Sequence, residues 1–316
     1  MSEREDRIAA FLAAAGWDRA RRLPIVGDAS TRRYERLLAP DGRTAVLVDS
    51  ENQPIERWLA VRDWLAGIGV RVPGVLAAAP EERLLLLEDL GDRHLDEAAV
   101  DGASEARLYA RALALLQAFR RPPPSFLPPL DPATLLDQLE LFLQQVTPEL
   151  PPAAADAFRC VWSTLLPLAC DAPAVFVHRD LHARNLMVLE GEELAVIDFQ
   201  DAFAGPPAYD FVSLAHDVRR EPGPAVVAFL REGLLLGASA GERAAFARAA
   251  AVLAAQRAMR IMAVFTRLAG PGGKPAYRAL LPRVESRLAL ALADPVLEPL
   301  AAWCARWWRR PVAAGS

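Results

Sequence analysis

The sequence of 316 residues contains almost no lysine: 35 of its 36 basic residues are arginine, and Lys274 is the exception. This scarcity excludes two common ways of holding ATP phosphates. A Walker A loop ends in Gly-Lys-Ser/Thr, whereas Lys274 is followed by Pro275. The lysine that protein kinases carry on a strand of the small lobe is missing as well. Any ATP site in this chain must therefore contact the phosphates with other groups.

Cysteine is also scarce, and the chain has no excess of positive charge. Three cysteines without zinc-ligand spacing support neither a disulfide framework nor a zinc site, so we expect a reducing cytoplasm. A net charge of −4 lacks the positive field typical of nucleic-acid binding. The first residues are charged rather than signal-peptide-like, and charged side chains interrupt the apolar stretches 224–239 and 244–266. We expect a monomer with no nucleic-acid or membrane partner.

The hydrophobic pattern changes character near residue 92. Before it, helices are predicted at 3–15 and 55–65, and strands at 23–26, 34–38, 45–48, 75–78 and 84–87. After it, Ala/Leu/Arg-rich helices dominate, and a short β-rich segment at 175–198 interrupts them. The pattern predicts an α+β protein, with a small antiparallel sheet in an N-terminal lobe at 1–91. A larger, mostly helical C-terminal lobe is predicted at 92–316.

The interrupting β-rich segment contains a polar loop that carries the candidate chemistry. It reads His178-Arg-Asp-Leu-His-Ala-Arg-Asn185, and Asp198 follows after a second strand-like run. Phosphoryl transfer needs a group that positions the attacking hydroxyl, and oxygen ligands for Mg²⁺ on the nucleotide phosphates. Asp180 offers a carboxylate, while Asn185 and Asp198 offer oxygen ligands of the kind that Mg²⁺ prefers. By composition, this His-x-Asp-x₄-Asn spacing is expected by chance only about 0.002 times.

These motifs resemble those of the aminoglycoside phosphotransferase/choline kinase family, which shares a two-lobed fold with protein kinases. The resemblance implies an ATP-dependent kinase in which Asp180 is the catalytic base and His178 orients the loop. It also implies that Asn185 and Asp198 bind Mg²⁺. Asp210, in a later Tyr-Asp pair, would support the catalytic loop.

A narrower resemblance rests on residues 27–34, 87–92, 197–202 and 205–210. These segments are similar to those of bacterial anomeric kinases that act on N-acetylmuramate and N-acetylglucosamine. Those enzymes use ATP to make the sugar 1-phosphate in cell-wall recycling. Two alternatives stay open: another small-molecule kinase of the same fold, of aminoglycoside, choline or homoserine type, and a catalytically silent nucleotide-binding regulator.

The nucleotide is expected to bind the N-terminal lobe. The small residues from Gly27, with the hydroxyls of Ser30 and Thr31, would let backbone amides approach phosphates, although an ordinary β-turn explains them equally well. Glu88 and Leu90 follow a strand where kinase-like folds join their lobes. Backbone groups there would contact the adenine.

The missing lysine leaves a specific question. Strand 45–48 aligns with the family's lysine-bearing strand, so Val48 or a neighbour takes that position. Arg32 or Arg33 could replace the lysine, since arginine offers a planar fork of donors. Alternatively, backbone amides and Mg²⁺ suffice, or the protein binds nucleotide without catalysis.

The acceptor is expected against the helical lobe. The candidate contacts are polar residues near the catalytic motif or on a helix at 249–268: Arg184, Gln200, Asp201, Arg257 and Arg260. An arginine fork would suit the lactyl carboxylate of N-acetylmuramate, but arginines at such positions are more often solvated. Lys274 lies in a Gly/Pro-rich segment that is either a mobile gate or an exposed turn.

Overall fold

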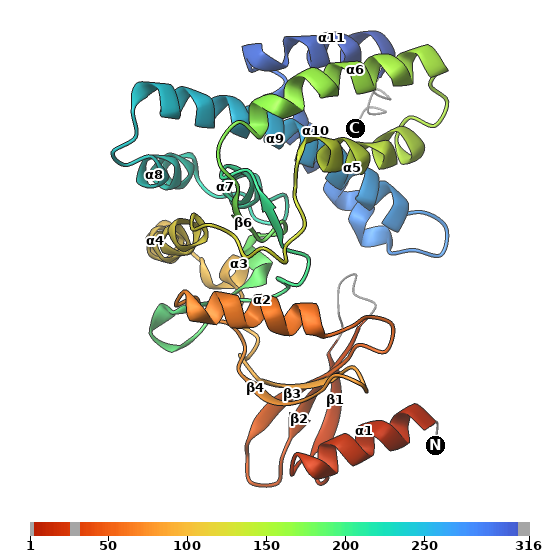
Figure 1. Ribbon diagram of the computed structural model, residues 1–316, viewed down its shortest axis with the longest axis vertical. Coiled ribbons are helices and arrows are strands. Elements are labelled where there is room, and N and C mark those ends of the chain that lie inside the picture. The colour runs from red at the N-terminus through yellow and green to blue at the C-terminus, as the bar shows by residue number, and fades with distance from the viewer. Residues whose placement is uncertain (1–2, 26–31, 309–316) are drawn as a thin grey trace. The chain divides into compact units, whose positions relative to one another are not determined.

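The computed structural model describes residues 3–25 and 32–308 (Figure 1). The chain divides into two compact units, Met1–Ala98 with Arg184–Asp201, and Ala99–Ala183 with Ala202–Ser316. The two units are defined by the contacts that residues make within each unit. The predicted boundary between lobes 1–91 and 92–316 remains a prediction.

The first unit is built on a five-stranded antiparallel sheet in the order β1-β2-β3-β5-β4. Its elements are α1 (Glu3–Ala14), β1 (Arg21–Ile25), β2 (Arg33–Leu38), β3 (Thr44–Asp49), α2 (Glu56–Gly67), β4 (Val75–Ala79), β5 (Leu84–Glu88), α3 (Leu95–Ala98), β7 (Leu186–Val188) and β8 (Leu194–Val196). Each of the five strands predicted before residue 92 overlaps an observed strand, which confirms the small antiparallel sheet.

The alternation of side chains gives this sheet two different faces. One face buries an apolar cluster against α1: Ile8, Leu12, Trp17, Leu37, Ala45, Leu47, Leu84 and Leu86. Residues paired across β2 and β3 share a face, so the pair Arg33 and Asp49 lies on the α1 face. The next pair, Tyr34 and Val48, lies on the opposite face. Figure 1 shows α1 and α2 on opposite sides of the sheet.

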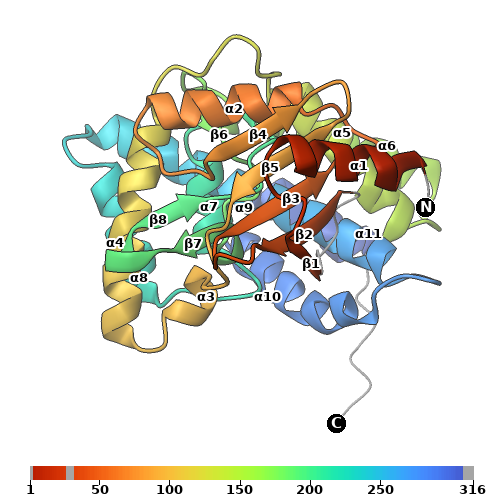
Figure 2. The same ribbon diagram turned by 90° about the horizontal axis from the view of Figure 1, so that it is seen from below.

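Strands β7 and β8 form a separate hairpin within the first unit (Figure 2). Its antiparallel register pairs Leu186 with Val196. Isolated bridges join the hairpin to N-terminal residues, Ala195 to Arg71 and Met187 to His94. The segment that follows the catalytic loop therefore packs with the N-terminal part of the chain.

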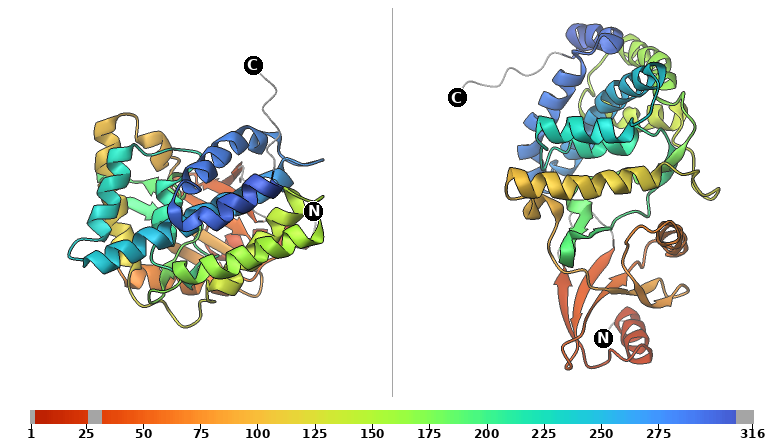
Figure 3. Two further views of the ribbon diagram at one scale, coloured as in Figure 1. Left: turned by 90° about the horizontal axis from the view of Figure 1, so that it is seen from above. Right: turned by 90° about the vertical axis from the view of Figure 1, so that its left-hand side faces the viewer.

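The second unit is mostly helical. Its elements are α4 (Gly102–Phe119), α5 (Pro132–Gln145), α6 (Pro152–Ala169), β6 (Val175–Val177), β9 (Phe203–Gly205), α7 (Tyr209–Ala215), α8 (Pro224–Leu234), α9 (Ala240–Leu268), α10 (Leu281–Ala291) and α11 (Glu298–Trp307). Short 3₁₀ helices lie at Pro275–Leu280 and Pro295–Leu297 in this unit, at Glu190–Glu192 in the first unit, and at Ala183–Asn185, where the chain passes from the second unit to the first. Helices α6 and α11 lie side by side (Figure 3), and Trp303 donates to the Ala154 carbonyl oxygen at 2.9 Å. Trp303 therefore contributes to the core.

Helix α9 is the longest element of the second unit, with 29 residues. Its length and composition would allow it to cross a membrane, but 61% of its most apolar window is buried inside the protein. Two polar side chains of α9, Gln256 and Arg257, are buried and hydrogen-bonded. Helix α9 thus packs as a core helix, and it positions part of the candidate site.

Candidate active site

The catalytic-loop motif begins where β6 ends, and a buried carboxylate supports it. Asp210, at the start of α7, accepts hydrogen bonds from the backbone N–H of His178 at 2.6 Å and of Arg179 at 3.0 Å. Strand β6 pairs with β9, which brings these two parts of the chain together. Burial raises the pKa of Asp210, and it outweighs the charge and hydrogen bonds of His178, which lower it.

Arg257 of α9 supports the same loop. Its Nη1 donates to the Arg179 carbonyl oxygen and its Nη2 to Ser213 Oγ, both at 2.6 Å. The guanidinium also lies 4.8 Å from the centre of the Tyr209 ring, and Arg257 is only 6% exposed. Arg179 has a φ of 80°, which non-glycine residues seldom adopt. The contacts of Asp210 and Arg257 hold this unfavourable backbone in place.

Asp180 follows the strained residue. One carboxylate oxygen lies 3.6 Å from Arg260 Nη1, and the Asp180 side chain is 37% exposed against 11% for Arg260. Burial alone would raise the pKa of Asp180. The positive charges of Arg260, Arg257 and Arg179 outweigh burial and hold this pKa well below its usual value. The carboxylate is therefore ionised at neutral pH.

Asn185 and Asp198 extend from the same end of the β7–β8 hairpin in the first unit. Beyond the pair of Leu186 and Val196, the Ile197 N–H donates to the Asn185 carbonyl oxygen at 3.1 Å. Asp198 has a φ of 62°, again in the left-handed region. The hairpin thus brings one amide and one carboxylate side chain to a common end. This oxygen-donor set fits Mg²⁺, which completes its coordination with phosphates and water.

Two residues predicted to contact the acceptor substrate, Gln200 and Arg184, interact with other side chains. Gln200 Nε2 donates to Asp198 Oδ1 at 2.8 Å, so it orients a candidate metal ligand. Arg184 pairs with Asp96 at 3.3 Å. Asp201 is exposed, and so is Lys274, whose backbone N–H closes a turn.

The Glu88 side chain is committed to structure. Its carboxylate accepts from the Gly74 N–H at 3.0 Å and forms an ion pair with Arg71. A neighbouring groove of about 560 Å³ is also lined by Leu90 and contains four carboxylates and one arginine. These charged groups are Arg71, Glu88, Asp89, Glu190 and Glu193. Its negative charge makes this groove unsuitable for nucleotide phosphates.

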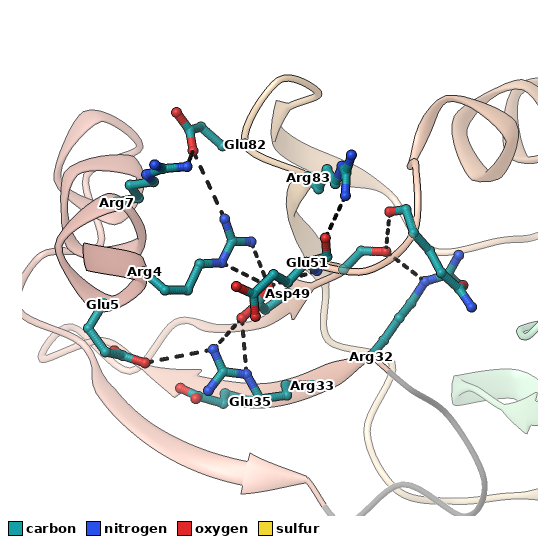
Figure 4. Close-up of polar contacts among 12 residues, drawn as sticks. Arg4, Glu5, Arg7, Arg32, Arg33, Glu35, Asp49, Glu51, Glu82 and Arg83 are labelled. Carbon is teal, nitrogen blue, oxygen red and sulfur yellow. Dashed lines mark hydrogen bonds and ion pairs between the residues drawn. The ribbon is translucent and has the colours of Figure 1, made fainter. Parts of the chain in front are cut away.

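The predicted phosphate contacts are only partly described. Gly27, Ser30 and Thr31 lie outside the described residues. Arg33 donates through Nε to Asp49 Oδ2 at 3.0 Å, whereas Arg32 donates through Nε to Ser50 Oγ at 3.1 Å (Figure 4).

The sequence analysis missed two contacts at the site. Asp217 accepts from the Ala183 N–H at 3.0 Å and so holds the end of the catalytic loop. Asp217 lies two residues beyond the end of α7 (Tyr209–Ala215), so helical spacing from Asp210 gave no signal for this contact. Trp58 of α2 lies 5.2 Å from the Phe199 ring, beside Asp198. No local pattern indicates this contact between distant segments.

Comparison with known proteins identifies relatives over almost the whole chain. Residues 21–246 match a family model described as a phosphotransferase enzyme family. An N-acetylmuramate/N-acetylglucosamine kinase of Caulobacter vibrioides is 32% identical over 97% of this chain and 97% of its own. A Pseudomonas aeruginosa protein of the same name is 34% identical over 89% of this chain and 87% of its own.

A solved structure shows the same fold. The ADP-bound aminoglycoside phosphotransferase APH(2'')-Ib matches with a TM-score of 0.63 at 14% identity, over 94% of this chain and 99% of that one. The match confirms the predicted protein-kinase-like fold class.

Replacing Asp210 by asparagine should release the backbone amides of His178 and Arg179. The side-chain NH₂ group of the new asparagine would face a backbone N–H, and neither of these donors would have an acceptor. A buried N–H without an acceptor lowers the free energy of unfolding by about 1–3 kcal/mol. We expect both amides to exchange with solvent roughly tenfold faster or more, as measured by hydrogen exchange. The exposed Asp171→Asn change is the control and should alter neither amide. Unchanged protection in Asp210→Asn would contradict the supporting role.

Proposed function

Because this chain belongs to the phosphotransferase enzyme family, we propose that it transfers the γ-phosphoryl group of ATP to the anomeric hydroxyl of N-acetylmuramate, N-acetylglucosamine or both. The supporting observation is similarity over nearly the full chain to kinases named for these sugars, together with the presence of Asp180, Asn185 and Asp198. The product would be a sugar 1-phosphate, consistent with a role in cell-wall sugar recycling. We propose a cytoplasmic monomer with no nucleic-acid or membrane partner.

In this proposal Asp180 receives the proton of the sugar hydroxyl. The sugar oxygen forms a new bond to the γ-phosphorus, while the bond from that phosphorus to the ADP oxygen breaks and its electron pair leaves with ADP. A carboxylate with a lowered pKa is a weak base, so Asp180 acts largely by positioning the hydroxyl. His178 and Asp210 hold the loop backbone that carries it.

Asn185 and Asp198 are the proposed ligands of Mg²⁺. Bound Mg²⁺ would neutralise charge on the nucleotide phosphates. Gln200 restrains the Asp198 carboxylate by its hydrogen bond, and Phe199 anchors the adjacent backbone against Trp58. Gly27, Ser30 and Thr31 remain proposed phosphate contacts, and the backbone at Glu88 and Leu90 remains the proposed adenine contact.

On the acceptor side we propose Arg260 rather than Arg257. The terminal nitrogens of Arg257 already donate to Arg179 and Ser213, so Arg257 supports the loop. Arg260 lies beside Asp180, where its positive charge would suit an acidic sugar better than a cationic aminoglycoside. Arg184, Gln200 and Asp201 remain weaker candidates for acceptor contacts.

The proposed substrate can be tested by coupled ADP release. N-acetylmuramate and N-acetylglucosamine should stimulate release in the presence of Mg-ATP, whereas choline, homoserine and kanamycin should not. Phosphorus NMR of the product would locate the phosphate on the anomeric carbon. Stimulation by one of the other acceptors alone would identify a different kinase of this family, and stimulation by none would favour a regulator.

Changing Asp180 to asparagine should abolish sugar phosphorylation. The amide cannot accept the proton, and loss of a positioned proton acceptor lowers rates by about 10²–10⁴-fold. Mg-ATP affinity, measured by calorimetry, should stay within about twofold because the proposed metal ligands are intact. Asp198→Ala is the contrasting variant and should weaken Mg-ATP binding. Normal turnover by Asp180→Asn would eliminate the assignment.

Changing Arg260 to glutamine should move the acidic limb of the pH–rate profile. Arg260 lowers the pKa of Asp180, so its removal should raise that pKa. Because the reaction requires the ionised carboxylate, kcat/KM for N-acetylglucosamine should begin to fall at a higher pH. Arg260→Lys retains the positive charge, so the pH at which kcat/KM begins to fall should change less. A profile that is identical in Arg260→Gln and wild type would contradict this role.

A further inference from the structure

We propose that Arg32 contacts the nucleotide phosphates in place of the missing strand lysine, and that its neighbour Arg33 does not. This inference rests on the proposed kinase function. It follows from which face of the sheet each arginine occupies and from what fixes each guanidinium.

The register of β2 and β3 separates the two arginines. The strand lysine of a protein kinase pairs with the nucleotide phosphates and with a glutamate of a helix. In this chain helix α2 lies on the side of the sheet opposite α1 (Figure 1), and this is the side that Val48 shares with Tyr34 across the ladder. Val48 or a neighbour takes the lysine position in the sequence. Arg33 pairs with Asp49 and therefore lies on the other face, towards α1. Arg32 is one step further along the chain, which returns its side chain to the face of Val48.

A hydrogen bond independently places Arg32 with the residue after Asp49. Arg32 Nε donates to Ser50 Oγ, so these two side chains meet just beyond the last ladder pair, Arg33 and Asp49. Ser50 Oγ in turn donates to the Gln53 carbonyl oxygen at 2.7 Å. Both members of the pair are buried, with Arg32 9% exposed and Ser50 1% exposed. This hydrogen bond restrains the orientation of the guanidinium, and a guanidinium is a group that suits bidentate recognition of phosphate.

Arg33 is engaged in ion pairs with Asp49 and, at 3.9 Å, with Glu5 of α1. Its Nε donates to Asp49 Oδ2, and Arg4 of α1 donates to the other oxygen of the same carboxylate at 2.6 Å. Burial would raise the pKa of Asp49, but Arg4 and Arg33 outweigh it and lower the pKa. Figure 4 shows Arg33 grouped with Asp49 and Arg4, whereas Arg32 lies apart from that group. Arg33 thus belongs to the attachment of α1 to the sheet.

Nucleotide affinity without catalysis tests this assignment. Calorimetry with Mg²⁺ would compare AMP-PNP, which carries β- and γ-phosphates, with AMP, which lacks them. Arg32→Ala should weaken AMP-PNP binding about tenfold, as expected for one charge-assisted contact, and leave AMP binding within about twofold. Arg32→Lys should recover part of the loss, since it restores a point charge. Arg33→Ala is the matched control and should leave the affinity for both nucleotides within about twofold.

The outcomes distinguish this inference from the proposed function. Equal weakening of AMP and AMP-PNP by Arg32→Ala would indicate a structural role and overturn the inference, as would no weakening of either. If Arg32→Ala does not fold, the same measurements are made with Arg32→Gln, which preserves most of the side-chain volume. The Arg32→Ala variant could lose affinity for AMP-PNP alone while the wild-type protein phosphorylates no sugar. That result would support the phosphate contact of Arg32 and refute the proposed substrates.

Discussion

The backbone of Arg179 is the constraint on which the reactive loop depends. Its φ of 80° is unfavourable for a residue with a side chain, so the conformation persists only where surrounding groups enforce it. Asp210 binds its N–H and Arg257 binds its carbonyl oxygen, so two buried side chains hold both backbone polar groups of this one residue. This double attachment fixes the direction in which the chain continues to Asp180. The position of Asp180 thus depends on two side chains that lie outside the motif from His178 to Asn185.

Arginine suits these attachments for a geometric reason. Arg257 reaches a carbonyl oxygen and a hydroxyl at the same time while its flat face covers the Tyr209 ring. A lysine ammonium has the charge but not the fixed fork or the planar face. Around Asp180, neighbouring arginines outweigh the effect of burial and keep the acid ionised. An arginine-rich composition therefore supplies both the rigid supports of the loop and the electrostatic environment of its acid.

Much of this arrangement was predictable because its signals are local. The five strands of the N-terminal sheet follow from alternation and turn residues. The motif from His178 to Asn185 pointed to the loop. The use of each arginine was not predictable, because spacing on α9 gives Arg257 and Arg260 similar positions. Only the tertiary packing distinguishes a buried support from a side chain beside the Asp180 carboxylate.

The same limit explains why the sequence could not choose between Arg32 and Arg33. Strand ends are uncertain by one or two residues, and a shift of one residue inverts the face of every side chain. The observed pairing of Arg33 with Asp49 removes this ambiguity. The proposal for Arg32 would then account for a kinase-like sheet without lysine on β3. Directly paired residues of adjacent antiparallel strands lie only about 4.5–5.5 Å apart, so a long side chain at the start of β2 can serve the face where a β3 lysine would stand. On this proposal the positive charge on that face comes from the residue before β2 rather than from β3.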